Sequence, residues 1–194
     1  MKKTLTIVLA FVLVIAMSVA GTFAYLTSQD SVTNTFTVGK VKITLDEAKT
    51  SVYGVVDAAA TARVKANEYK LIAGHEYAKD PIVHVDADSE SCWLFIKVED
   101  GIAALEDNDT IAAQLAAAGW TPVAAGSNIY AYKEFVASGA NVPTFATFKI
   151  LGTKTETELN AFKDAKIVVT AFAVQADGFA TSAAAYAANT GVVK

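Results

Sequence analysis

The 194-residue chain carries 16 Lys and Arg against 20 Asp and Glu, which gives a net charge of −4 at pH 7. An acidic chain without a basic cluster lacks the electrostatic footprint of a nucleic-acid-binding protein, so we expect no nucleic-acid partner. Its single cysteine, Cys92, excludes an intrachain disulfide and a multi-cysteine zinc site. Cys92 lies in an apolar run, which favours a buried thiol over a reactive one.

The N-terminal 24 residues have the order of a secretory signal peptide. Lys2 and Lys3 are followed by an almost unbroken apolar run, and the small residues Thr22 and Ala24 occupy positions −3 and −1 before Tyr25. This order predicts cleavage between Ala24 and Tyr25 and secretion of the remainder. The alternative is an uncleaved membrane anchor, although the apolar run is shorter than the ~20 residues that span a bilayer comfortably.

Residues 25–38 form a polar segment rich in Ser and Thr, which we expect to be extended. Beyond it, apolar and polar residues alternate through Phe36 and Val38 and again from Val41 to Leu45, with Gly39 between the two runs. Alternation with a period of two predicts strands with one buried face. Further strands are predicted at Glu68–Ile72, Ile82–Val85, Cys92–Val98, Trp120–Val123, Ile129–Phe135, Thr144–Leu151 and Ile167–Val174.

Helical patterns are few and short. Residues Thr110–Ala118 are predicted to form a helix that Asp109 or Thr110 caps and Gly119 ends. Shorter helices are predicted at Thr155–Phe162 and Ser182–Ala188, and the Ala-rich stretch 48–62 is either a loop or a short helix. Eight or nine strands with one or two short inserted helices predict a mainly β, antiparallel β-sandwich that forms one domain over residues 39–194.

The stretch Gly21–Leu45, with the sequence GTFAYLTSQDSVTNTFTVGKVKITL, resembles the TasA–camelysin family of exported Gram-positive proteins. The resemblance continues at Leu71–Gly74, Lys79–Pro81 and Val174–Phe179, whereas Glu99–Val142 carries no matching motif. It implies a jelly-roll-like β-sandwich, a signal peptide cut by a SipW-type signal peptidase, and a location in the extracellular matrix or at the cell surface. Members of the family form biofilm fibres or remain on the cell surface.

The resemblance also implies a mode of assembly. In fibres of TasA-like proteins the extended N-terminal segment of one subunit adds a strand to the next, and such a head-to-tail contact grows into a homopolymer. Residues 25–38 contain no Pro or Gly, and the predicted donor strand places four side chains on one face: Val32, Asn34, Phe36 and Val38. Other matrix components are further expected partners. The alternative is that Thr33–Val38 pairs within its own domain.

Enzymatic function is a weaker hypothesis. Camelysin-like proteins have been classed as metallopeptidases, and His75-Glu76 begins like a zinc-peptidase helix motif. Lys79 stands where the second zinc-binding His of that motif belongs, and the other histidine, His84, falls in a predicted strand. We therefore expect no catalytic residues, no metal and no cofactor, and predict a turn histidine and a strand histidine.

Two other binding functions were weighed. Asp86, Asp88 and Glu90 alternate as at the start of a calcium-binding loop, but Ser91 and Lys97 replace the required Gly and Glu, which favours a solvated turn. A monomeric surface-binding module remains the alternative to a fibre protein. Its binding residues would lie on the predicted loops Gly101–Asp109 and Gly126–Ile129, because loops on a rigid scaffold commonly carry binding residues.

The signal peptide yields the first test. N-terminal sequencing of secreted material should begin at Tyr25, because the small residues at positions −3 and −1 direct cleavage after Ala24. A protein that begins at Met1 and fractionates with membranes would show that the segment is an anchor.

Overall fold

The computed structural model describes residues 3, 6–10, 12, 39–107 and 110–193. The chain divides into Met1–Val38 and Gly39–Lys194, and residues 3, 6–10 and 12 of the first unit are helical. Among the described residues, no helix has the length and apolar character needed to cross a membrane. The predicted cleavage and donor-strand residues lie outside the described residues: Ala24, Tyr25, Val32, Asn34, Phe36 and Val38.

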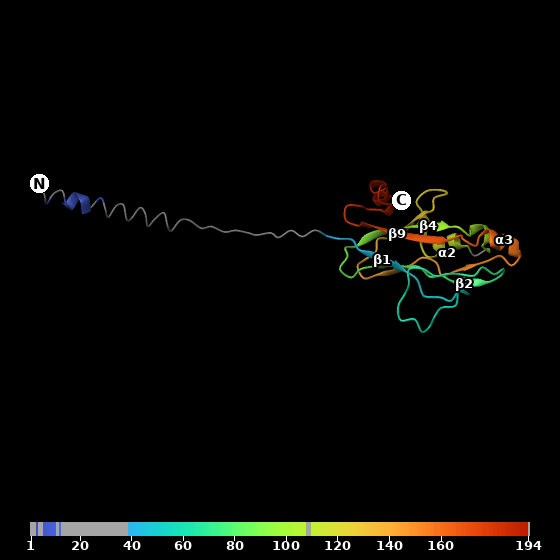
Figure 1. Ribbon diagram of the computed structural model, residues 1–194. Helices are drawn as coiled ribbons and strands as arrows, with labels where there is room; N and C mark the ends of the chain where they lie inside the picture. Colours follow the sequence, from blue (N-terminus) through green and yellow to red (C-terminus); the bar gives the residue numbers. More distant parts are fainter. Residues whose placement is uncertain (1–2, 4–5, 11, 13–38, 108–109, 194) are drawn as a thin grey trace. The chain divides into compact units, whose positions relative to one another are not determined.

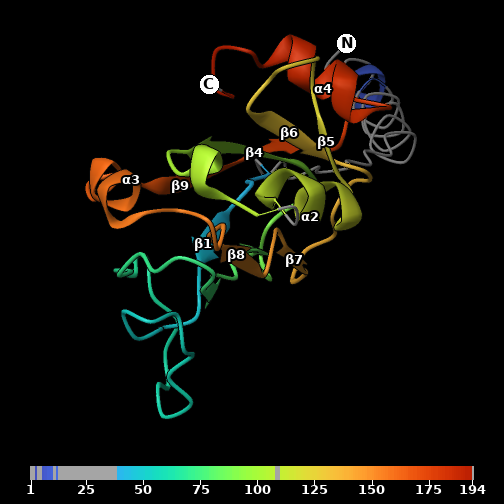
Figure 2. The same cartoon turned by 90° about the vertical axis from the view of Figure 1, so that its right-hand side faces the viewer.

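The second unit is mainly β and contains three antiparallel sheets, as predicted (Figures 1 and 2). The three-stranded sheet has the order β1 (Ile43–Asp46), β3 (Ile82–Val85) and β7 (Asn141–Pro143). The two-stranded sheet pairs β2 (Glu76–Ala78) with β8 (Thr147–Lys149). The four-stranded sheet has the order β5 (Trp120–Pro122), β6 (Ile129–Tyr132), β4 (Cys92–Asp100) and β9 (Ile167–Gln175). This arrangement is consistent with a β-sandwich, whereas the jelly-roll connection stays a prediction.

The helices of this unit are short: the 3-10 turn η1 (Ala103–Leu105), α2 (Ile111–Ala117), α3 (Glu156–Ala161) and α4 (Ser182–Ala188). Helix α2 confirms its prediction in detail. The Thr110 side-chain oxygen accepts a hydrogen bond from the Ala113 N–H at 3.3 Å, and Ile111 and Leu115 are buried on one face. Gly119 then takes φ = +91°, a left-handed conformation that glycine adopts without strain and that ends the helix.

Strand β4 is buried on both faces. Leu94 and Ile96 are fully buried in an apolar cluster to which β3, β7 and β8 also contribute, while Trp93 and Phe95 belong to a second cluster that includes Ala185 of α4. Figure 2 shows α4 lying over the four-stranded sheet. Successive side chains of a strand point to opposite faces, so a strand covered on both sides needs a continuous apolar run rather than alternation.

The segment between β1 and β3, hereafter the 47–80 segment, projects from the sheets and contains β2 (Figures 1 and 2). Arg63 ties it down at both ends: its Nη1 lies 3.0 Å from Asp80 Oδ2 and its Nε lies 2.5 Å from Asp46 Oδ1. Burial opposes the charge of Asp46, but hydrogen bonds from His84 and Arg63 outweigh it and lower the pKa of this carboxyl. Ion pairs thus hold in place a long segment that has little regular structure.

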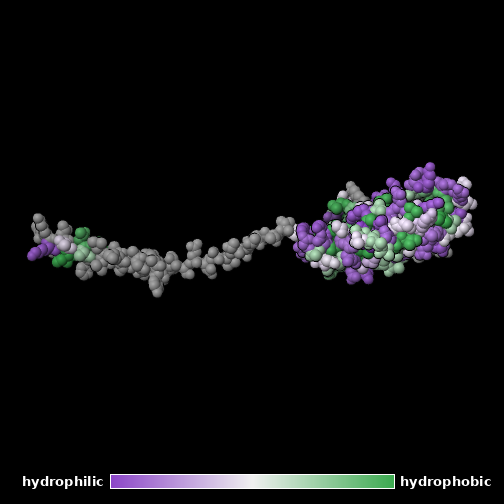
Figure 3. Space-filling view, turned by 60° about the horizontal axis from the view of Figure 1, so that its bottom comes forward, coloured by the Kyte–Doolittle hydropathy of each residue, from purple (hydrophilic) through white to green (hydrophobic). Residues whose placement is uncertain are grey.

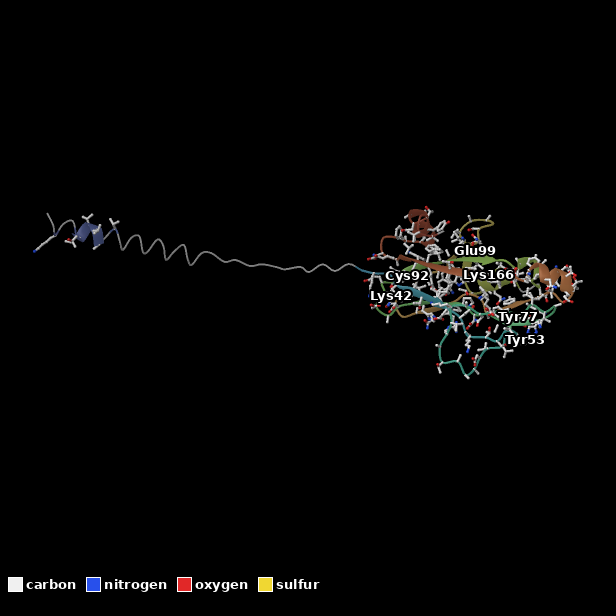
Figure 4. The ribbon with its side chains drawn as sticks, viewed as in Figure 1. Lys42, Tyr53, Tyr77, Cys92, Glu99 and Lys166 are labelled. Atoms are coloured by element: carbon white, nitrogen blue, oxygen red, sulfur yellow. The ribbon has the colours of Figure 1, made fainter. Side chains whose placement is uncertain are left out.

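The turn around Tyr53 rests on β2. Gly54 has φ = +70°, and a Cβ atom at this position would lie 2.5 Å from the Tyr77 Cα. The Gly54 carbonyl accepts a hydrogen bond from the Ala78 N–H at 3.0 Å. Figure 4 shows Tyr53 and Tyr77 close together at this end of the domain. Only glycine meets both the backbone angle and the close approach.

Some sequence predictions of strands were wrong. Glu68–Ile72 is not a strand: the Tyr77 hydroxyl donates to the Lys70 carbonyl and accepts from the Ile72 N–H, so a side chain replaces a strand partner. Strands β2 and β7 were not predicted, because three residues are too few to show alternation. The strand predicted at Thr144–Leu151 is confined to β8, and the stretch 48–62 is a loop.

Because β4 is buried on both faces, truncating a side chain on β4 should lower the free energy of unfolding much more than truncating an exposed side chain on β9. Leu94→Ala should lower the free energy of unfolding by about 2–5 kcal/mol, because it leaves a cavity at a fully buried site. The matched change Val168→Ala on β9, where the side chain is 41% exposed, should cost much less, on the order of 1 kcal/mol or below. Urea denaturation of both variants measures the difference, and equal losses would contradict the assignment of the core.

Candidate functional site

The longest strand edge without a partner strand belongs to β9. This strand pairs with β4 along nine residues on one side, and on the other side it pairs with none of the strands that the structure describes. Hydrogen bonds just beyond the two ends of the pair set its register: the Ala176 N–H donates to the Ser91 carbonyl, and the Gly101 N–H donates to the Lys166 carbonyl. Because hydrogen-bonded residues alternate along an antiparallel pair, the even-numbered residues of β9 direct their backbone groups toward β4. The N–H and C=O groups of Ile167, Val169, Ala171 and Ala173 therefore face away, and no backbone or side-chain group of the described residues bonds to them.

The composition of β9 leaves this edge unprotected. Proteins commonly block strand edges with proline, charged side chains or short strands, because a free edge pairs with other chains. Strand β5 ends in Pro122 and strand β7 ends in Pro143, and both have only three residues. In contrast, β9 reads IVVTAFAVQ, with no proline, glycine or charge. Among the edges that the structure describes, this one is best suited to accept another strand.

Strand β1 contributes a second, shorter free edge beside it. The Asp86 N–H donates to the Lys42 carbonyl, so the register of β1 with β3 directs the backbone groups of Ile43 and Leu45 away from β3. Lys65 Nζ donates to the Leu45 carbonyl, and an isolated bridge between Glu47 and Val64 ends this edge. Strands β1 and β9 lie side by side in different sheets (Figure 1).

A groove of about 1040 Å³ opens between the end of β1 and the start of β9, and we call it the β1–β9 groove. Apolar and aromatic side chains from five parts of the chain line it: Leu45, Tyr69, Phe148, Phe162, Ile167 and Val169. Charged side chains of both signs complete the lining in equal number, and Figure 4 labels one of them, Lys166, close to β9: Lys65, Lys79, Lys163, Lys166, Asp46, Glu47, Glu68 and Asp164. The groove thus combines free backbone groups with an apolar lining, which are the two features that bind an extended peptide.

Burial fixes the protonation state of Tyr69 in the lining of the groove. Burial raises the pKa of its hydroxyl to about 12, and the hydroxyl donates to the Ala78 carbonyl at 3.0 Å. Tyr69 therefore remains a neutral donor at physiological pH. Its ring packs edge-on against Phe148 with a centroid distance of 5.1 Å, which gives this part of the groove a fixed aromatic wall.

The two histidines lie apart in the roles predicted for them, a turn and a strand. His75 Nε2 is 2.9 Å from the Tyr53 carbonyl oxygen, and its ring packs edge-on against Tyr77. His84 on β3 contacts Asn141 Oδ1 through Nδ1 at 2.6 Å and Asp46 Oδ1 through Nε2 at 2.9 Å. Within the described parts of the chain, no three His, Cys, Asp or Glu side chains come together as a metal-binding group.

The predicted turn at residues 86–90 is confirmed. The Ser89 N–H donates to the Asp86 carbonyl at 3.1 Å, and the side chains of Asp86 and Asp88 pair with Lys42 and Lys40. The Lys42 ammonium holds the pKa of Asp86 at about 2. These carboxylates therefore join the turn to the chain that leads into β1.

A second hollow of about 650 Å³ lies near Gly39, away from the β1–β9 groove. Its lining includes Trp93, Phe179 and the 58%-exposed ring of Phe135, together with Glu90 and Asp177. Apolar residues are otherwise scattered among polar ones over the face shown in Figure 3, as on ordinary protein surfaces. This aromatic hollow is therefore the second candidate binding site.

The two loops predicted to carry binding residues differ in their burial. In Gly101–Asp109, the side chains of Ile102, Leu105 and Glu106 are buried, and residues 108–109 lie outside the described chain. Around Gly126 the loop is a short turn of small exposed residues. Strand β9 was predicted from the sequence, but its position at the edge of a sheet was not. The long run without charge or proline is the sequence feature that distinguishes this free edge.

No protein-family model, no curated protein and no solved structure matches this chain.

Proline substitutions on β9 test which of its backbone N–H groups face β4 and which face outward, because proline removes the N–H group. Thr170→Pro should destabilise the domain by roughly 3 kcal/mol or more, because the Thr170 N–H faces β4 and proline has no N–H. Ala171→Pro, one residue further, removes an N–H that faces outward and should leave the domain folded. Thermal melting followed by circular dichroism compares the two, and a reversed order would show that the other edge of β9 is free.

Proposed function

We propose that this protein is a secreted structural protein of the extracellular matrix or cell surface that assembles head to tail into fibres. The N-terminal segment of one copy adds a strand along β9 of the next copy. The observation that carries this proposal is the free, nine-residue edge of β9 beside the apolar β1–β9 groove. The sequence resemblance to the TasA–camelysin family supports the same function.

Backbone and side chains contribute differently to this contact. The outward N–H and C=O groups of Ile167, Val169, Ala171 and Ala173 pair with the backbone of any extended peptide, which gives affinity without fixing the register. The register comes from side chains that alternate along the incoming strand. Phe36 and Val38 fill the apolar part of the groove, because alternate residues of a strand lie on one face.

Two free-energy terms of the contact oppose each other. Burial of Phe36, Val38 and Val32 contributes on the order of 1.5–3 kcal/mol for each side chain. Ordering of the segment costs about 1–2 kcal/mol per residue in backbone entropy. Because the ordering cost of the whole segment exceeds this burial term, assembly also needs the backbone hydrogen bonds to β9, and it depends on the apolar side chains of the donor and on a free N-terminus. Removal of residues 1–24 by a SipW-type signal peptidase therefore controls assembly.

The donor half of the mechanism is tested with three proteins: the mature chain, a chain that begins at Gly39, and the mature chain carrying Phe36→Asp. Electron microscopy and sedimentation should detect fibres of the mature chain alone, because the other two lack the donor strand or its apolar anchor. Polymerisation of the Gly39 chain to the same extent would contradict donor-strand assembly.

The acceptor half is tested within the same experiment by a matched pair of substitutions. Val168→Lys places a charge on the exposed face of β9, at a side chain that is 41% exposed, and should reduce fibre yield at least tenfold. Val192→Lys changes an equally apolar side chain that is 63% exposed and lies outside the groove, and should leave fibre yield unchanged. Equal yields from the two variants would place the acceptor edge elsewhere.

A monomeric surface-binding module is the second candidate function, and the aromatic hollow around Phe135 favours it. Exposed aromatic rings beside carboxylates suit flat apolar or cationic ligands. Solution size separates the two functions, since a mature protein that stays monomeric at high concentration while binding cells contradicts assembly.

A further inference from the structure

Three polar side chains of the 47–80 segment form a hydrogen-bonded cluster in the wall of the β1–β9 groove. Lys79 Nζ lies 2.6 Å from Glu47 Oε2, and Asn67 Nδ2 donates to Glu47 Oε1 at 3.0 Å. Lys79 is 8% exposed and Glu47 is 5% exposed. One carboxylate therefore holds an amine on one oxygen and a primary amide on the other, and Asn67 itself is half-buried.

We propose that Lys79 and Asn67 join in an intramolecular amide bond, with Glu47 as the group that transfers the proton. The Lys79 ammonium gives a proton to the Glu47 carboxylate, and the neutral Nζ attacks Cγ of Asn67. A C–N bond forms between Nζ and Cγ, the bond between Cγ and Nδ2 breaks, and Nδ2 leaves as ammonia with protons relayed through Glu47. The reaction is a transamidation, so it needs no oxidant, reductant or external reagent.

The backbone around Asn67 is arranged to assist this attack. The Thr50 N–H donates to Asn67 Oδ1 at 2.9 Å, where negative charge develops as Nζ adds to the carbonyl carbon. The Ala48 carbonyl accepts from Nδ2 at 2.8 Å and orients the leaving nitrogen. Every polar atom of the Asn67 side chain thus has a partner that fixes the amide relative to Glu47. Glu47 thus binds both reacting side chains, Lys79 through one oxygen and Asn67 through the other, and a shared partner of this kind favours an intramolecular reaction.

Aromatic side chains stand beside the cluster. Tyr69, Tyr77 and Phe148 stack against one another close to the 47–80 segment, and Tyr69 lies in the same groove lining as Glu47, Asn67 and Lys79. Proton transfer over a 2.6 Å hydrogen bond then supplies the nucleophile.

The bond would close a covalent loop from Asn67 to Lys79, which contains β2 and the turn at His75. Loop closure removes conformational freedom from the unfolded chain, as a disulfide does. The chain has a single cysteine and no intrachain disulfide, so the amide would be its covalent brace in an extracellular setting. This inference does not depend on fibre formation.

Intact mass spectrometry of the full-length folded protein tests the proposal. The expected mass is lower than that of the sequence by one ammonia molecule. Trypsin does not cleave after an acylated lysine, so digestion should yield a branched product in which residues 66–70 are joined to residues 71–97 through Asn67 and Lys79. A folded protein that retains the full sequence mass after prolonged incubation, with separate peptides ending at Lys79, would overturn the proposal.

Two variants separate the proposed bond from other reactions of asparagine. Lys79→Arg keeps the positive charge beside Glu47 but lacks the nucleophile, and should show the full sequence mass. Glu47→Gln keeps both reacting side chains and should form the bond at least tenfold more slowly. Cyclisation of Asn67 onto its own backbone also releases ammonia, but it does not need Lys79. Loss of ammonia that persists in Lys79→Arg would therefore contradict the proposal, and circular dichroism confirms that each variant is folded.

Discussion

Complete pairing and packing of β4 is the constraint on which the remaining structure depends. This strand bonds to β9 along its whole length and to β6 on its other edge, while its two faces pack into separate apolar clusters. With both edges of β4 occupied, β9 becomes an outer strand, and its own outer edge has no strand to pair with. The burial of β4 and the exposure of β9 are two results of the same strand order.

Much of the fold was predictable because its signals are local. The uninterrupted apolar run of β4, the Thr110 cap and Gly119 stop of α2, and the run of β9 each determine an element within about ten residues of chain. Strand Glu68–Ile72 was predicted wrongly because the Tyr77 hydroxyl satisfies backbone groups that a neighbouring strand would otherwise bind. Such tertiary hydrogen bonds leave no periodic pattern in the sequence.

The candidate sites were less accessible to sequence reasoning, because both are built from distant residues. The β1–β9 groove requires two strands from different sheets to lie side by side, and the sequence shows the strands without their neighbours. The polar cluster combines Glu47, Asn67 and Lys79, which fall outside the strands and helices predicted from the sequence. Single charged residues in such segments are usually solvated, so only the fold reveals that these are buried.

In the proposed fibre, proline at the ends of β5 and β7 limits the number of neighbouring copies that one molecule binds. With those edges closed, each copy in that fibre would offer one long accepting edge on β9 and one N-terminal segment to donate, and would therefore have a valency of two. Units of valency two join into lines that do not branch. A copy that has lost its N-terminal segment still accepts a neighbour but donates to none, so it terminates the line. Proteolysis ahead of Gly39 would therefore set fibre length through the fraction of such chain terminators.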